Sequence, residues 1–175
     1  MFKYSPGKKH TLFRSLLLLL SVCMVQDAAA CRRPPRGQLI GVDEHIMRAG
    51  DVSVARVVSA TPGKGWVEYR FLVLQRLAGP ELYTFTVLGG APSSHDSSFD
   101  NHSDPAFWKH GGGRVMNSSD CLIHPSFVLG GTYLVFQGRP ATWRNFEKID
   151  VVDGKVNEND RWLAYVKTGL GRRRQ

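Results

Sequence analysis

The sequence predicts a mainly β fold, a five-stranded OB-fold Greek-key barrel with short flanking helices. Short segments rich in β-branched and aromatic residues recur along the chain, and clusters of Gly and Pro separate them. One segment near each end has a helical period instead. Five strands, the second of them long, with a helix at each end suit a small barrel of one domain.

The expected elements follow from the spacing of the apolar residues. In chain order they are a helix at 42–49, strands at 51–60, 66–77, 83–88, 133–136 and 145–152, and a helix at 160–168. In the long strand, Val67, Tyr69 and Phe71 alternate with Glu68 and Arg70. Such alternation predicts a strand with one buried and one solvated face.

Gly, Asn and Asp residues mark the boundaries of these elements. Gly50 is expected to stop the first helix, and Asp153-Gly154 to turn the chain after the last strand. Asn159 is expected to cap the last helix and Gly169 to stop it, which leaves residues 169–175 as a basic tail.

Residues 1–30 read as a secretory signal peptide. An apolar stretch at 15–25 follows a basic region with charges at Lys3, Lys8, Lys9 and Arg14, and Ala28-Ala29-Ala30 supplies the small residues of a cleavage site. The apolar stretch is shorter than the roughly 20 residues that a membrane-spanning helix needs. Cleavage after Ala30 leaves 145 of the 175 residues as one domain and makes Cys31 the first of them. The predicted location is extracellular or periplasmic.

Cys31 admits three interpretations. In the first, its free amine and its thiol together carry chemistry at the new N-terminus. In the second, Cys31 is lipidated as in bacterial lipoproteins, although Ala28 stands where the processing enzyme favours a Leu-like residue. In the third, Cys31 is simply half of a structural disulfide. The mature chain keeps two cysteines, Cys31 and Cys121, and an even number in an oxidising compartment indicates a bridge.

The charge of the chain is modestly basic and lies at its ends. The signal contains four of the 23 Lys and Arg and one of the 15 Asp and Glu, so 19 cationic and 14 anionic residues give the mature chain +5. Secretion argues against nucleic acid as a partner. The basic ends are either solvated tails or contacts for anionic lipid, polysaccharide or an acidic protein face. A membrane contact is expected only if Cys31 is lipidated, and the oligomeric state stays open.

Residues 89–120 form a long polar insertion. It contains side chains of the types that bind metals, namely His95, Asp96, His102, Asp104 and His110. Their spacing matches no closed metal site, so the alternatives are a solvated loop and a transition-metal site. The same insertion contains Phe99, Phe107 and Trp108, which either anchor a partner or fold back on the barrel.

Four segments give the chain a resemblance to a known family. They are Cys31 itself, the strand-like run at 51–58, the long run at 67–80, and Ser119-Asp120-Cys121 followed by the strand-like run at 130–138. In order and spacing they resemble the tissue inhibitors of metalloproteinases and the wider netrin-like group. The resemblance covers about residues 31–168.

The resemblance implies an OB-type barrel with a Cys31–Cys121 disulfide. It also implies a secreted protein-binding module, with inhibition of zinc metalloendopeptidases as a specific form of that function. In such inhibitors the amine and carbonyl of the N-terminal cysteine, here Cys31, chelate the zinc of the target. A catalytic zinc keeps one position open for water, which such a chelate can displace. No cofactor is then needed beyond that zinc.

Two departures from the family concern the N-terminus. Arg33 stands where the inhibitors have a second cysteine, so only one of their disulfides can form. Arg32 replaces the small hydroxyl residue that enters the specificity pocket of the target, and burying its guanidinium there requires a carboxylate partner. No nucleophile elbow, zinc-peptidase helix or phosphate loop occurs, and the protein is expected not to be an enzyme. The alternative function is a periplasmic or surface module that binds an anionic or metal ligand and inhibits nothing.

Overall fold

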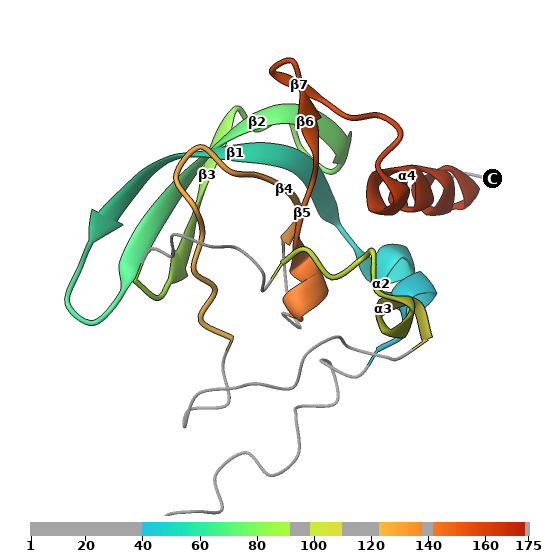
Figure 1. Ribbon diagram of the computed structural model, residues 1–175, viewed down its shortest axis with the longest axis horizontal. Helices are drawn as coiled ribbons and strands as arrows, with labels where there is room; N and C mark the ends of the chain where they lie inside the picture. Colours follow the sequence, from blue (N-terminus) through green and yellow to red (C-terminus); the bar gives the residue numbers. More distant parts are fainter. Residues whose placement is uncertain (1–39, 92–98, 110–122, 138–141, 174–175) are drawn as a thin grey trace, which may run out of the picture.

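An antiparallel sheet of five strands organises the protein (Figure 1). The structure is a computed structural model and describes residues 40–91, 99–109, 123–137 and 142–173. Its elements are α2 (Val42–Arg48), β1 (Asp51–Pro62), β2 (Val67–Ala78), β3 (Thr84–Gly89), α3 (Pro105–Lys109), β4 (Thr132–Gln137), the 3-10 turn η2 (Trp143–Asn145), β5 (Phe146–Lys148), β6 (Val151–Val152), β7 (Lys155–Val156) and α4 (Arg161–Arg172). The prediction of a mainly β fold with short helices is confirmed.

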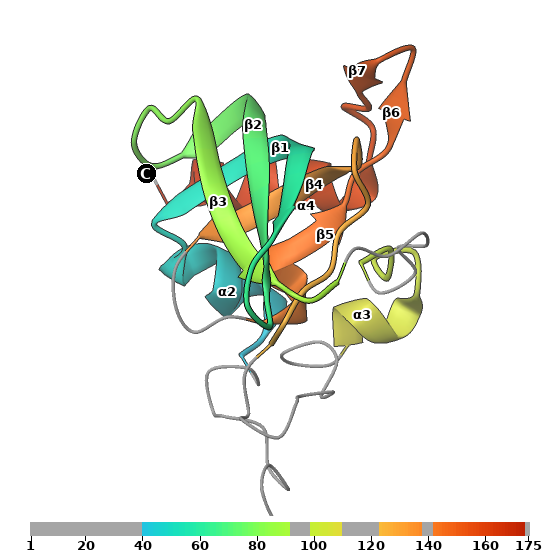
Figure 2. The same cartoon turned by 90° about the vertical axis from the view of Figure 1, so that its left-hand side faces the viewer.

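The strands stand in the spatial order β3-β2-β1-β4-β5, with β1 in the centre. β1 and β2 form a hairpin, β2 and β3 form the next one, and β4 returns by a long connection to pair with β1. This is the strand order of a Greek key. Within the described ranges no pairing joins the edge strands β3 and β5 (Figure 2). The sheet is therefore open there, and the closed barrel expected from the sequence is not formed.

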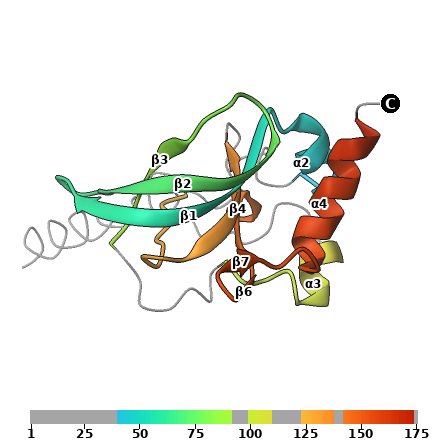
Figure 3. The ribbon, with the colours of Figure 1, turned by 90° about the horizontal axis from the view of Figure 1, so that it is seen from above.

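Each face of the sheet carries its own core. Adjacent residues of β4 show this: Tyr133 and Val135 point to one face, and Leu134 and Phe136 to the other. We call the first the aromatic core, formed by Ala55, Val57, Val67, Tyr69, Phe71, Phe99, Phe127, Tyr133, Val135 and Phe146. The second, the helix-side core, is closed by α2 and α4 (Figure 3). As predicted, Val67, Tyr69 and Phe71 are the buried residues of the long strand.

The last helix is longer than the sequence indicates. Asp160, not Asn159, is its N-cap, because one oxygen of the Asp160 carboxylate accepts hydrogen bonds from the backbone N–H groups of Trp162 and Leu163. The predicted stop at Gly169 is wrong, since the helix continues to Arg172. Gly169 serves close packing instead: a Cβ there would lie 2.9 Å from Cγ2 of Ile46 in α2.

α4 also contacts α2 through the residue that follows its last turn. Arg173 donates hydrogen bonds from Nη1 to the carbonyl oxygens of Ile46 and Ala49. Residues 169–173, expected to belong to a basic tail, are thus helix and helix cap. The last helix, α4, is therefore held against α2 by hydrogen bonds as well as by packing.

The segment predicted as one strand at 145–152 is divided in two. β5 ends at Lys148, and Ile149 enters the helix-side core while its N–H still donates to Thr132 O at 2.9 Å. The chain then leaves the sheet and forms the β6–β7 hairpin. The predicted turn at Asp153-Gly154 is confirmed, with φ of 49° and 75°. Positive φ at both positions is what a two-residue hairpin turn that matches strand twist requires.

Candidate functional site

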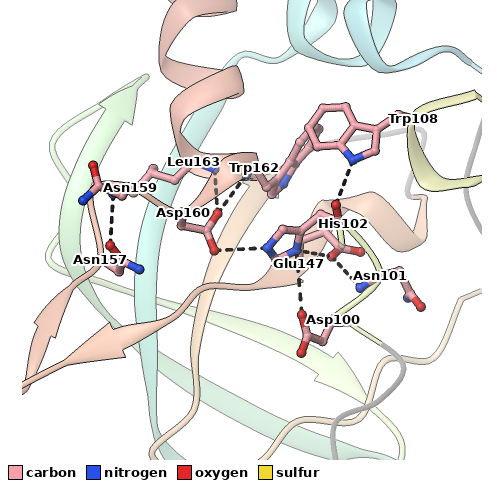
Figure 4. Close-up of polar contacts among 10 residues, drawn as sticks. All are labelled: Asp100, Asn101, His102, Trp108, Glu147, Asn157, Asn159, Asp160, Trp162 and Leu163. Carbon is pink, nitrogen blue, oxygen red and sulfur yellow. Dashed lines mark hydrogen bonds and ion pairs between the residues drawn. The ribbon is translucent and has the colours of Figure 1, made fainter. Parts of the chain in front are cut away.

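Three ionisable side chains from distant parts of the chain meet beside the helix-side core (Figure 4). His102 lies in the segment 99–109, which contains α3, while Glu147 comes from β5 and Asp160 from the start of α4. The imidazole lies between the two carboxylates. Nδ1 of His102 is 3.0 Å from Glu147 Oε2, and Nε2 is 3.1 Å from Asp160 Oδ2. We call this group the histidine clamp.

Backbone groups fix each member of the histidine clamp. The N–H of Asn101 donates to Glu147 Oε2 at 3.1 Å, and the indole N–H of Trp108 donates to the carbonyl of His102 at 2.8 Å. Asp160 uses its second oxygen to cap α4. One carboxylate thus orients both a helix and an imidazole, so the clamp joins the segment 99–109 to β5 and to α4.

Water has little access to these groups. His102 is 8% exposed, Glu147 1% and Asp160 4%. Burial acts to lower the pKa of His102, but the hydrogen bonds to Asp160 and Glu147 outweigh it and raise that pKa to about 10. The imidazole is therefore a cation at neutral pH and donates from both nitrogens.

The pKa values of the two carboxyl groups shift in opposite directions. Burial raises the pKa of Glu147, and the hydrogen bonds from His102 and Asn101 oppose that rise. Burial also acts to raise the pKa of Asp160, but hydrogen bonds from His102 and from the N–H of Leu163 outweigh it and hold that pKa below its usual value.

Arg144 adds a second buried cation beside Glu147. It is 1% exposed, its guanidinium donates to the carbonyl of Phe107, and it lies 4.5 Å from the centroid of the Phe107 ring. Burial lowers the pKa of Arg144, and the Glu147 charge opposes this. Two basic side chains, His102 and Arg144, thus lie beside the buried carboxyl groups of Glu147 and Asp160, and the exposed carboxylate of Asp100 lies 4.0 Å from Nδ1 of His102.

The geometry of the histidine clamp favours a structural role over catalysis. A general base needs a pKa near the working pH and a nitrogen within reach of substrate. His102 has neither, because both ring nitrogens are hydrogen-bonded to carboxylates and its pKa is about 10. Across the part of the chain that the structure describes, no group of three or more His, Cys, Asp or Glu side chains is arranged to hold a metal ion.

Most of the predicted site residues lie outside the described residues. These are Cys31 and Cys121 of the expected disulfide, Arg32 of the expected pocket contact, and His95, Asp96 and His110 of the candidate metal ligands. Two candidates are described. His102 belongs to the histidine clamp, and Asp104 accepts from the N–H of Ala106 at 2.8 Å where α3 begins. The metal site therefore stays a prediction.

The aromatic residues of the insertion fold back on the domain, the second of the two alternatives stated for them. Phe99 is fully buried in the aromatic core, and its carbonyl accepts from the N–H of Lys148 in β5 at 2.5 Å. Phe107 lies edge-on to Trp162 of α4, with ring centroids 5.1 Å apart. Trp108 is half-buried against Tyr165. Part of the expected loop is thus packed structure.

Sequence reasoning missed Glu147, Arg144 and Asp160 as partners of His102. For Asp160 a signal exists, since it directly precedes an amphipathic helix and aspartate is a favoured N-cap. Glu147 and Arg144 give no local signal, because 45 and 42 residues separate them from His102. Only the folded chain brings these charges together.

Comparisons with family models, curated proteins and solved structures found no match to the chain. None of the helices in the described ranges has the length and apolar character needed to cross a bilayer.

Proposed function

We propose that the chain is a secreted protein-binding module of the netrin-like kind, built on an OB-type barrel with an open seam between β3 and β5. The observation that carries this proposal is the strand order β3-β2-β1-β4-β5. An OB fold is a five-stranded, partly open Greek-key barrel. Pairing β3 with β5 is the one step that would turn the observed sheet into such a barrel.

The way in which the fold is stabilised favours binding over catalysis. The buried charged side chains of the histidine clamp form hydrogen bonds that connect β5, α4 and the segment 99–109 within the protein. Small extracellular modules present their surfaces and termini to partners, and an internal charge cluster leaves those surfaces free. We accordingly propose that the protein is not an enzyme.

In the specific form of this proposal, the mature N-terminus inhibits a zinc metallopeptidase. The amine and carbonyl of Cys31 would occupy the water position of the zinc, and a disulfide to Cys121 would hold them in place, which lowers the entropy cost of binding. An α-amino group with a pKa of about 8 gives up its proton at modest cost. Arg32 restricts the targets to peptidases with an acidic pocket, because a buried guanidinium needs a carboxylate.

The experiment begins with the intact mass and the N-terminal residue of the secreted protein, without and with reductant. A free amine at Cys31 and a mass two hydrogens lower before reduction are expected. A free thiol at Cys121 would remove the disulfide, and a lipid on Cys31 would favour the alternative, a surface module for an anionic or metal ligand.

Inhibition is then measured against zinc peptidases with acidic and with apolar specificity pockets. The matched control carries one extra alanine before Cys31, which converts the chelating amine into an amide and leaves the disulfide intact. Inhibition that is limited to acidic pockets and abolished by the extra alanine supports the specific form. Equal inhibition by both proteins contradicts zinc chelation through Cys31.

A further inference from the structure

The outer surface of β1, β2 and β3 beyond α2 and α4 carries exposed leucine, valine and arginine side chains. Three cross-strand rows define it: Arg56, Leu72 and Thr84; Ser59, Arg70 and Thr86; Thr61, Glu68 and Leu88. We call it the Leu–Arg face. Residues directly opposite one another in an antiparallel sheet share a face. The alternate residues Val57, Tyr69 and Phe71 are buried in the aromatic core, so these rows point away from it.

Apolar side chains are unusually exposed on the Leu–Arg face. Leu88 is 58% exposed, Val58 44% and Leu72 41%. Val58 has no cross-strand partner in the register, because β1 bulges between Val57 and Ser59, and it adds an apolar side chain between Arg56 and Arg70. Exposed apolar groups that lie together and are flanked by polar residues are typical of protein contact surfaces.

The charges of the Leu–Arg face are not compensated from within the protein. Arg70 is exposed, and no carboxylate within the described ranges forms an ion pair with it. Among the described residues, the hydrogen-bond acceptors of the Arg56 guanidinium are neutral oxygens, Thr132 Oγ1 at 3.5 Å and Gly154 O at 3.4 Å. Glu68 is the single carboxylate in the three rows. A partner with acidic side chains would complement both arginines.

The side chains on this face favour a protein partner over nucleic acid or a sulfated glycan. Proteins that bind single-stranded nucleic acid stack successive bases on several aromatic side chains, whereas the three rows contain no aromatic side chain, and the exposed Trp66 lies at their end, just before β2. A sulfated glycan could form ion pairs with the two arginines, but the leucine and valine side chains between them would make no favourable contact with it. Arginines interspersed with exposed leucine and valine side chains match a polypeptide in which acidic and apolar side chains alternate.

We propose that the Leu–Arg face docks an extended acidic segment of a partner protein, which pairs carboxylates with Arg70 and Arg56 and packs apolar side chains on Leu72, Val58 and Leu88. This proposal rests on the proposed function as a protein-binding module and names the chemistry of the partner. It does not involve Cys31, so the two can fail separately.

The test uses the secreted protein labelled with nitrogen-15 and three probes: a peptide with alternating Glu and Val, a matched peptide with alternating Lys and Val, and a heparin-derived oligosaccharide. We expect only the acidic peptide to bind, with amide shift changes confined to β1, β2 and β3. Binding of the oligosaccharide with the same shift changes would identify a polyanion site and overturn the proposal, as would absence of peptide binding.

Variants separate docking from folding. Arg70→Glu should weaken the acidic peptide by about tenfold or more and should gain binding of the Lys–Val peptide, which a misfolded protein cannot do. Leu72→Asn should weaken the acidic peptide without reversing the charge preference. Lys109→Glu, the same charge change at an exposed position of α3, is the control and should leave the affinity unchanged. If Arg70→Glu leaves the affinity unchanged too, the proposal is wrong, whereas zinc-peptidase inhibition through Cys31 is unaffected by either result.

Discussion

His45 and His102 have nearly the same exposure to solvent, yet the protein shifts their pKa values in opposite directions. His45 is 6% exposed and His102 8%. Burial, reinforced by the charge of Arg144, lowers the pKa of His45 to about 4, whereas the hydrogen bonds to two carboxylates raise that of His102 to about 10. Burial acts to lower the pKa of both histidines. The charged groups around each ring decide whether its pKa ends below or above the ordinary value.

His45 has an aromatic neighbour and no carboxylate partner like those of His102. Its ring centroid lies 4.4 Å from that of Phe136, and its Nε2 has no hydrogen-bond partner among the described residues. His45 therefore acts as a neutral packing residue of α2, while His102 acts as a cation that binds three segments together. The following variants test this difference, from the largest expected effect to the smallest.

His102→Ala should cost about 3–5 kcal/mol of the free energy of unfolding, because it leaves Glu147 and Asp160 buried without the cation between them. Urea unfolding followed by circular dichroism measures this. The double variant His102→Ala/Glu147→Gln should recover part of the loss, since it removes one stranded charge. If the double variant is as unstable as the single one, lost packing rather than charge explains the effect.

The contribution of the histidine clamp should fade at alkaline pH. The folded pKa of His102, about 10, lies above its ordinary 6.5, so its stabilisation is complete below about pH 6.5 and is lost as the pH rises through 10. Urea midpoints of the wild type should fall over this range, and those of His102→Ala should fall less. Parallel curves for the two proteins would show that other groups cause the decline.

Two variants of Asp160 separate its two tasks. Asp160→Asn keeps a good N-cap but loses the charge opposite His102, for an expected cost of about 1–3 kcal/mol. Asp160→Ala also loses the cap to Trp162 and Leu163 and should cost about 1 kcal/mol more. Thermal unfolding measured by calorimetry compares them. Equal stability of the two variants would mean that the cap contributes nothing.

Gly169→Ala tests the packing around His45. The new methyl would lie 2.9 Å from Ile46 Cγ2, so α2 must shift, at a net cost of about 1–2 kcal/mol. The shift should hydrate His45 and raise its pKa toward 6.5, while the pKa of His102 stays high; NMR titration of the imidazole protons reports both. Gly171→Ala, where a Cβ meets no atom within 4 Å, is the control and should stabilise by about 0.5–1 kcal/mol.

His45→Leu should change stability least, by less than about 1 kcal/mol at neutral pH, because no hydrogen bond of Nε2 is lost. Its effect should appear in acid. The folded pKa of His45 lies below 6.5, so the wild type loses stability as the pH falls from about 6.5 through 4, and the variant should lose less. A large loss at neutral pH would reveal a polar role for His45.

Features set by neighbouring residues were predictable from the sequence. The alternation of Val67, Tyr69 and Phe71 predicted the buried face of β2, and Asp153-Gly154 predicted the hairpin turn. The prediction that the last helix stops at Gly169 is wrong, because the sequence cannot distinguish a glycine that ends a helix from one that allows two helices to pack closely. The contact with Ile46 shows that Gly169 is of the second kind.

The histidine clamp was beyond sequence reasoning for a different reason. His102 lies in a polar segment in which apolar residues do not recur regularly, and Glu147 is a charged residue within a short strand. The local sequence around each of them therefore predicts an exposed side chain. A buried charge is tolerated only when its partners arrive from elsewhere in the chain. The same reason applies to the aromatic residues of the insertion, because their packing sites on β5 and α4 exist only in the folded chain.

The contact between α4 and α2 has a consequence for the order in which the chain folds. Arg173 bonds to Ile46 across 127 residues, and Gly169 packs against the same isoleucine. During synthesis the contacts of Ile46 with Gly169 and Arg173 cannot form until the last helix has emerged. Contacts so distant in sequence slow folding and prolong exposure of apolar surface. Truncation within the last helix would therefore leave the beginning of the domain unfinished as well as its end.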